Sequence, residues 1–136
     1  MQANNWTRLA DTINRRYGAS CGLIKKEAGG FVVLAGGSNS KANNNPRSST
    51  EIFDLSTKKW SKGPSIGVKI KNGRMVSVNG DQELLLIGGF NGTTAVTDIK
   101  RLDAGMSSWI SAGHLTTARF DHVAMVVSEE SIPPLC

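Results

Sequence analysis

The stretch FVVLAGG, residues 31–37, runs from an apolar segment into a pair of glycines. The stretch LLLIGG, residues 84–89, repeats this pattern 52 residues later. Short apolar runs of this kind predict strands, and paired glycines predict a backbone with positive φ or a close neighbour. A tryptophan follows each pair, at Trp60 and Trp109. Because both markers recur in the same order, the sequence indicates an internal repeat.

Further markers extend each copy of the repeat. The segment EIFDL at 51–55 has a counterpart in DIKRL at 98–102, and RYGASCGLI at 16–24 has a counterpart in RFDHVAMVV at 119–127. A copy between these last two, at 69–78, is weaker. Independent markers that keep one order and one period of about 50 residues indicate a repeat architecture.

Within one period the β signals are short and are separated by turns. The runs Met75–Val78 and Glu83–Ile87 enclose the residues NGDQ, in which Asn-Gly tolerates the positive φ of a hairpin turn. A short run around Trp60 ends at Gly63-Pro64. One period therefore predicts four short antiparallel strands, which is the size of a β-propeller blade. We expect an all-β chain with almost no helix.

The chain resembles the kelch-repeat family over about residues 6–127. The residues that carry the resemblance are the double glycine after an apolar strand, Trp60, and the aromatic residue Phe53 seven positions before it. The second copy departs from the family pattern, since Lys100 stands where an aromatic residue is usual and two extra residues precede Trp109. The resemblance implies a partial β-propeller of four-stranded antiparallel blades, kelch type.

The repeat divides the chain into units of blade size. Residues 16–62 and 69–112 are two expected blades, 6–15 are the expected end of a preceding blade, 119–127 are the expected first strand of a further blade, and 128–136 are a tail. Closed propellers have four to eight blades. Four or five bare apolar side chains on an open face would forfeit about 6–15 kcal/mol. Three organisations stay open: a piece of a longer propeller, self-assembly or assembly with another chain to close the ring, and a stable open arc.

Charge and motif content exclude several classes of function. The formal net charge is +5, but the basic residues are scattered in small pairs without aromatic interleaving, so we expect no nucleic acid and no membrane as partner. The chain has no metal-type cysteine spacing, nucleophile elbow or phosphate loop. We therefore expect no catalysis, no metal and no cofactor, and the resemblance implies a structural role for His122. The absence of a secretory leader predicts a cytoplasmic protein.

Recognition through loops is the function that the resemblance implies. Propeller strands form a rigid scaffold, and the loops at its ends carry binding residues. By resemblance, the polar loop 38–49, its shorter counterpart 90–95 and the residues before each first strand line one face, which binds a protein or peptide. Its guanidinium groups suit an acidic partner. The candidate partner-binding residues are Arg16, Ser38, Asn39, Lys41, Asn43, Arg47, Lys69, Phe90, Asn91 and Arg119.

The sequence leaves other interpretations open. The loop 38–49 is also compatible with a solvated insertion, and Arg16 and Arg119 with salt bridges or backbone contacts inside a blade. The alternative function is that of a piece of a propeller enzyme, such as a carbohydrate-active oxidase or a sialidase-like protein, whose catalytic residues are not in this sequence. A third possibility is a truncated product without a function.

Overall fold

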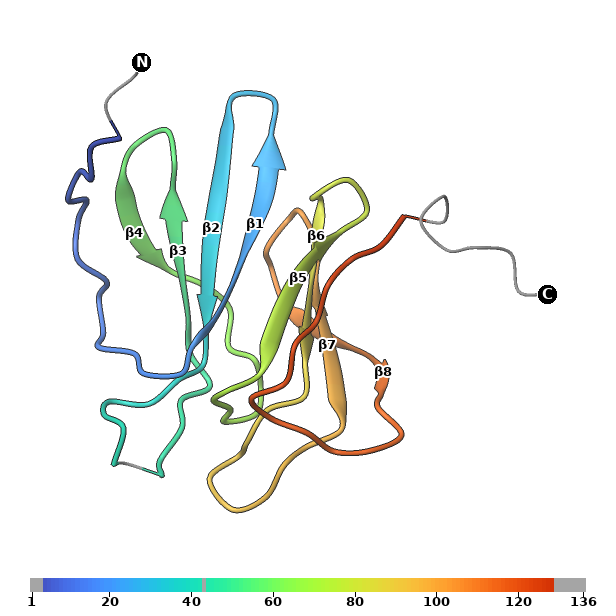
Figure 1. Ribbon diagram of the computed structural model, residues 1–136. Helices are drawn as coiled ribbons and strands as arrows, with labels where there is room; N and C mark the ends of the chain where they lie inside the picture. The colour runs from blue at the N-terminus through green and yellow to red at the C-terminus, as the bar shows by residue number, and fades with distance from the viewer. Residues whose placement is uncertain (1–3, 43, 129–136) are drawn as a thin grey trace.

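The computed structural model describes residues 4–42 and 44–128 and contains two four-stranded antiparallel sheets (Figure 1). The first sheet consists of β1 (Ser20–Lys26), β2 (Gly29–Ala35), β3 (Thr50–Asp54) and β4 (Lys59–Lys62). The second sheet consists of β5 (Arg74–Val78), β6 (Glu83–Ile87), β7 (Asp98–Leu102) and β8 (Trp109–His114). The described residues form no helix, and so none that could cross a membrane. The expected fold class, an all-β chain of kelch-type blades, is confirmed.

Each sheet is a simple meander, because neighbouring strands in the sheet are also neighbours in the sequence. Tight turns connect β1 to β2, β3 to β4 and β5 to β6. Asn79 and Gly80 between β5 and β6 have φ values of 53° and 63°, as the Asn-Gly pair predicts. Between β3 and β4, the Asp54 carboxylate accepts hydrogen bonds from the N–H groups of Ser56 and Thr57.

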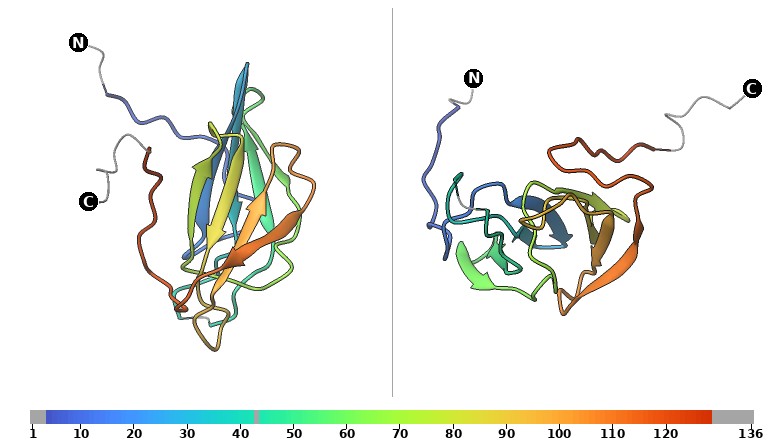
Figure 2. Two further views of the ribbon diagram at one scale, coloured as in Figure 1. Left: turned by 90° about the vertical axis from the view of Figure 1, so that its right-hand side faces the viewer. Right: turned by 90° about the horizontal axis from the view of Figure 1, so that it is seen from below.

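The two sheets are arranged like adjacent blades, with their first strands together (Figure 2, right). β1 packs against β5 and β6, while β4 and β8 lie furthest out. Gly22 in β1 allows the close approach, since a Cβ atom there would lie 2.6 Å from Leu84 Cδ2. The Ser77 hydroxyl donates to the Leu23 carbonyl at 2.7 Å and thereby joins the two inner strands.

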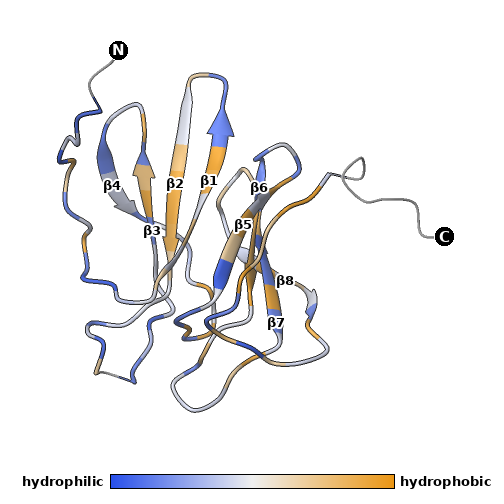
Figure 3. Ribbon diagram, in the orientation of Figure 1, coloured by the Kyte–Doolittle hydropathy of each residue, from blue (hydrophilic) through white to orange (hydrophobic). Residues whose placement is uncertain are grey.

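One hydrophobic core lies between the sheets, and apolar residues follow the strands that border it (Figure 3). Trp109 in β8 is only 8% exposed and donates its indole N–H to Thr50 Oγ1 of the first sheet at 3.1 Å. The buried core residues are Ile24, Val33, Ala35, Ile52, Ile66, Ile70, Leu84, Leu86, Leu102 and Trp109. Each sheet therefore buries apolar side chains against the other sheet.

The repeat-equivalent tryptophan of the first sheet has a different environment. The Trp60 ring lies 5.0 Å from that of Phe53, its cross-strand partner. Its indole N–H donates to the Ala10 carbonyl at 2.9 Å. Residues 4–16 thus run along the outer side of the first sheet, beside β4 (Figure 1).

Neither flanking segment forms a strand in the described part of the chain. Residues 119–127, the expected first strand of a further blade, pass beside β5 (Figures 1 and 2). A segment can form an antiparallel strand only where a second strand pairs with it through hydrogen bonds. The assignment of 6–15 and 119–127 to neighbouring blades stays a prediction.

Candidate partner-binding face

At one end of the sheets, segment 70–72 shares one type of backbone contact with segment 16–18 and another with segment 119–121. The Tyr17 N–H donates to the Ser38 carbonyl at 2.8 Å and Ser38 donates back at 2.9 Å, while Lys71 and Phe90 make the same pair of bonds at 3.0 and 2.8 Å. The N–H groups of Gly37 and Gly89 each donate at 2.8 Å, to the carbonyls of Ile70 and Arg119. These bonds make residues 16–18, 70–72 and 119–121 equivalent.

This equivalence corrects the alignment of the weakest repeat. Sequence comparison set Lys69 opposite Arg16 and Arg119, but the hydrogen bonds place Ile70 there. The physical reason is that the position faces the core in this copy, where Ile70 is 3% exposed. Lys71 therefore takes the place of Tyr17 and Phe120.

The last residue of each segment is in the left-handed region. Gly18, Asn72 and Asp121 have φ values of 66°, 56° and 52°. The Asn72 N–H donates to the Gly18 carbonyl at 2.7 Å, and the Asp121 N–H donates to the Asn72 carbonyl at 2.9 Å. Glycine, asparagine and aspartate tolerate this conformation best. The turns hold the preceding residues at the end of the molecule where the β2–β3 and β6–β7 loops lie.

Arg16 is buried inside the first sheet's loop end. Its side chain is 3% exposed and that of Glu51 is 1% exposed, and Arg16 Nη2 lies 2.9 Å from Glu51 Oε1. Arg16 Nη1 also donates to the carbonyls of Gly36 at 2.6 Å and Ser49 at 2.9 Å. The guanidinium group is therefore fully occupied by its own chain, which is the alternative that the sequence left open.

Glu51 receives further donors from the N-terminal segment. The N–H groups of Ile13 and Asn14 donate to its carboxylate at 2.8 and 3.0 Å. Burial raises the pKa of Glu51, but the hydrogen bonds from Asn14 and Arg16, with the charge of Arg16, outweigh burial and leave the pKa below its usual value. The ionised carboxylate therefore stabilises the fold.

This pKa shift predicts a difference in acid stability. A carboxyl group with a lowered folded-state pKa stabilises the chain above its unfolded pKa of about 4.3, and this contribution is lost as the pH falls through the folded-state pKa. We expect Glu51→Gln to lower the melting temperature strongly at pH 7 and less at pH 3, which lies below the unfolded pKa. Asp54, whose pKa is also lowered, is present in both chains and cancels in the comparison. An equal difference at both pH values would contradict this prediction.

The cationic side chains of the loop end border a cleft of about 300 Å³. Arg47 is half-buried and Lys69 is exposed. Arg47 Nη2 donates to Asn39 Oδ1, and Lys69 Nζ donates to Asn45 Oδ1 at 3.3 Å. Arg47 Nε is buried and has no acceptor among residues 4–42 and 44–128. In this part of the chain, neither Arg47 nor Lys69 forms a salt bridge with a carboxylate.

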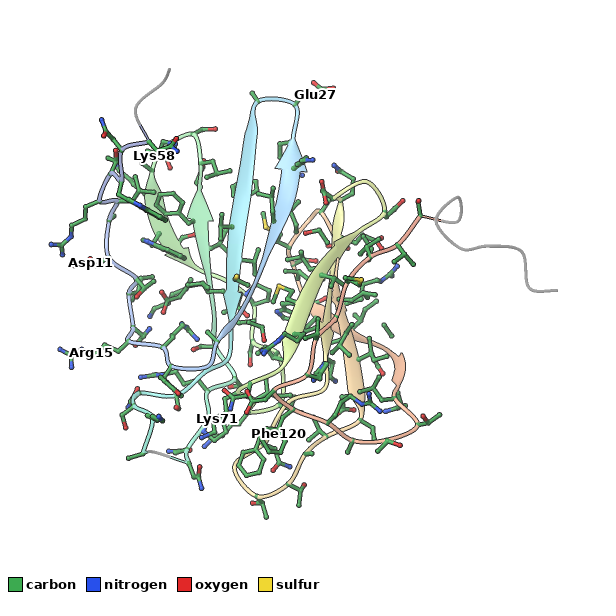
Figure 4. The ribbon with its side chains drawn as sticks, in the orientation of Figure 1. Asp11, Arg15, Glu27, Lys58, Lys71 and Phe120 are labelled. Atoms are coloured by element: carbon green, nitrogen blue, oxygen red, sulfur yellow. The ribbon has the colours of Figure 1, made fainter. Side chains whose placement is uncertain are left out.

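A second hollow of about 240 Å³ lies next to this cleft and is partly aromatic. The rings of Phe90 and Phe120 are 5.3 Å apart and tilted by 57°. Lys71, 7% exposed, has its Nζ 5.7 Å from the centre of the Phe90 ring and donates to Asn44 Oδ1 at 3.0 Å. Lys71 and Phe120 lie at this end of the molecule, opposite Glu27 and Lys58 (Figure 4).

His122 packs against Gly88, in the glycine pair that follows β6. A Cβ atom on Gly88 would lie 3.1 Å from His122 Cε1. Burial lowers the pKa of His122, the charges of Arg74 and Arg119 lower it further, and Asp121 opposes them. Its two ring nitrogens are buried without a hydrogen-bond partner in the described residues. The described ranges also hold no group of three or more His, Cys, Asp or Glu side chains placed to bind a metal.

A family profile of the kelch motif matches residues 29–67, which cover β2, β3 and β4 of the first sheet. This segment of the chain is a kelch motif. No curated protein matches the sequence. The kelch match includes the double glycine, Phe53 and Trp60, and the second sheet repeats the same four-stranded meander without a match of its own.

We define the loop face of the chain as residues 38–42, 44–48, 69–72, 90–95 and 119–121. Asn39, Lys41 and Asn91 are exposed there, as is Arg119, whose Nε donates to the Thr117 carbonyl at 3.4 Å. Ser38 is on the face but fully buried, with its hydroxyl donating to the Ser40 carbonyl. Asn43 lies outside the described residues.

Sequence reasoning missed three residues of the loop face, which are Lys71, Asn72 and Phe120. Two signals could have found them. Phe120 follows Arg119 as Tyr17 follows Arg16, and a repeat alignment shifted by one residue puts Lys71 at the same position. Asn72 before Gly73 is also a residue that tolerates the left-handed backbone conformation, as Gly18 does at the equivalent position.

Proposed function

We propose that this kelch module binds an acidic segment of a protein partner at its loop face and has no catalytic activity of its own. The observation that carries the proposal is the concentration of charge. The loop face contains five basic residues, Lys41, Arg47, Lys69, Lys71 and Arg119, and one acidic residue, Asp121, a net +4 of the chain's formal +5. Such a field attracts and orients a negatively charged partner.

The local geometry supports an acidic ligand. Arg47 and Lys69 border a cleft, and their only described side-chain partners are the neutral amides of Asn39 and Asn45. A carboxylate that replaced these amides would form charge-assisted hydrogen bonds, which are about twice as strong as neutral ones. The Arg47 backbone is anchored by hydrogen bonds with Gly37 at 2.7 Å and Ile70 at 3.0 Å, which reduces the ordering that binding requires.

A peptide selection tests the proposal. We expect random twelve-residue peptides selected on the purified chain to be enriched in Asp and Glu. Their affinity should fall at least tenfold in the combined variant Arg47→Gln, Lys69→Gln and Arg119→Gln, and should weaken with added salt. Arg16 is left out of this variant because it is buried in the fold.

The matched control is Lys59→Gln, which removes an exposed charge from β4 at the opposite end of the first sheet. This variant should bind the selected peptides as tightly as the wild type. Selected peptides without acidic enrichment, or binding that survives loss of the three loop-face charges, would overturn the proposal.

A further inference from the structure

We infer that the loop face recognises two side chains of its partner at once: an acidic one, and an apolar one two residues away in an extended segment. This inference rests on the proposed function and specifies the ligand. It comes from the two neighbouring hollows of the loop face, the cationic cleft and the aromatic pocket, which differ in chemistry and share a wall.

Residues that are close in the sequence line the two hollows. Asn45 borders the cationic cleft, and Asn44, the residue before it, borders the aromatic pocket. Likewise Lys69 borders the cleft and Lys71 the pocket. Ile70 between them is buried in the core, so the two lysines project from the same side of the backbone toward the face. The two hollows are therefore adjacent, and an i to i+2 step of an extended ligand, roughly 6.5–7 Å, is the spacing that we propose for its two side chains.

The cationic cleft has the chemistry of a carboxylate site. Its guanidinium and ammonium groups, on Arg47 and Lys69, have no carboxylate neighbour in the described residues. The buried Nε of Arg47 also lacks an acceptor there. A ligand carboxylate that reached this donor would satisfy it, and unsatisfied buried donors are costly.

The aromatic pocket has the chemistry of an apolar site. Phe120 is 45% exposed and stands against Phe90, so a ligand side chain that covers them removes aromatic surface from water. Lys71 already has Asn44 and the Phe90 ring as neighbours, so the pocket does not depend on a second ligand charge. Exposed aromatic residues beside cationic ones are typical of the anchor points of protein interfaces.

An extended ligand can fill both hollows because its alternate side chains point the same way. Residues i and i+2 of a strand-like segment lie on one face. Side chains at i and i+1 of such a ligand point to opposite faces, and so do side chains at i and i+3. The order Glu-x-Phe or Phe-x-Glu should therefore bind, whereas Glu-Phe should not engage both hollows.

Fluorescence anisotropy with capped, fluorescein-labelled peptides tests this spacing. The probe is Gly-Ser-Glu-Gly-Phe-Gly-Ser, with the reversed order Gly-Ser-Phe-Gly-Glu-Gly-Ser as a second probe. The matched controls are Gly-Ser-Glu-Phe-Gly-Gly-Ser and Gly-Ser-Glu-Gly-Gly-Gly-Ser. We expect the better of the two probes to bind at least fivefold more tightly than either control. Phe120→Ala should remove that advantage, and Lys69→Gln should weaken every peptide.

The outcomes separate the two proposals. Equal affinity for both spacings, or an advantage that survives Phe120→Ala, overturns the two-point inference, while weakening by Lys69→Gln still supports an acidic ligand at the loop face. If Lys69→Gln does not change the affinity for the acidic peptides, both the proposed function and the two-point inference are contradicted. Phe120→Ala should keep the wild-type melting temperature within a few degrees, because the ring is largely exposed.

Discussion

Replacing Arg16 with alanine should lower the free energy of unfolding by about 3–5 kcal/mol, measured by urea denaturation at pH 7. The reason is that the Glu51 carboxylate, 1% exposed, would stay buried without its cationic partner. The carbonyls of Gly36 and Ser49 would lose their guanidinium donor as well. Such a loss is a large part of the stability of an ordinary domain.

Two controls make this result specific. Arg8→Ala removes a salt bridge with Asp11 in which both side chains are about four-fifths exposed, and it should change the stability very little. In a double-mutant cycle, Arg16→Ala with Glu51→Ala should cost much less than the sum of the single changes, because each removes the same contact. Additive single effects would show that the pair is not coupled.

Trp109→Ala should cost about 3–5 kcal/mol in the same measurement. The indole is buried between the two sheets and is tied to Thr50 of the first sheet. Its removal opens a cavity in the core on which both sheets depend. Both sheets should therefore unfold together at a lower denaturant concentration.

Trp60→Ala is the matched control, because the two tryptophans are equivalent in the repeat. Trp60 is half-buried and contacts Phe53 and Ala10 on the outer side of the first sheet. Its loss should cost less than half as much as the loss of Trp109. If both changes cost the same, the core between the sheets is not the main source of stability.

Most of the fold could be predicted from the sequence, since the features that define it are local or periodic. The glycine pairs, the tryptophans and the Asn79-Gly80 turn each require a particular backbone, and together they imply four-stranded units. The weak copy at 69–78 was harder to align. Ile70 replaces an arginine there, and the backbone hydrogen bonds of Gly37 and Phe90 with this segment establish the equivalence.

The candidate site could be predicted only in outline. The sequence placed Arg47, Lys69 and Phe90 at one face, and the structure brings them around two adjacent hollows. It could not tell a binding arginine from a buried one, because the partner of Arg16 lies 35 residues away at Glu51. The pairing of Phe90 with Phe120 also depends on a contact between distant segments.

Chemical-shift mapping tests the central claim, binding of an acidic segment at the loop face, most directly. A peptide from the selection would be titrated into the ¹⁵N-labelled chain, and the shifted backbone amides identified. We predict that the shifts concentrate in the loop face, residues 119–121 included, and vanish in the combined Arg47, Lys69 and Arg119 variant. Shifts confined to the outer side of the first sheet, around Trp60 and β4, would contradict the account.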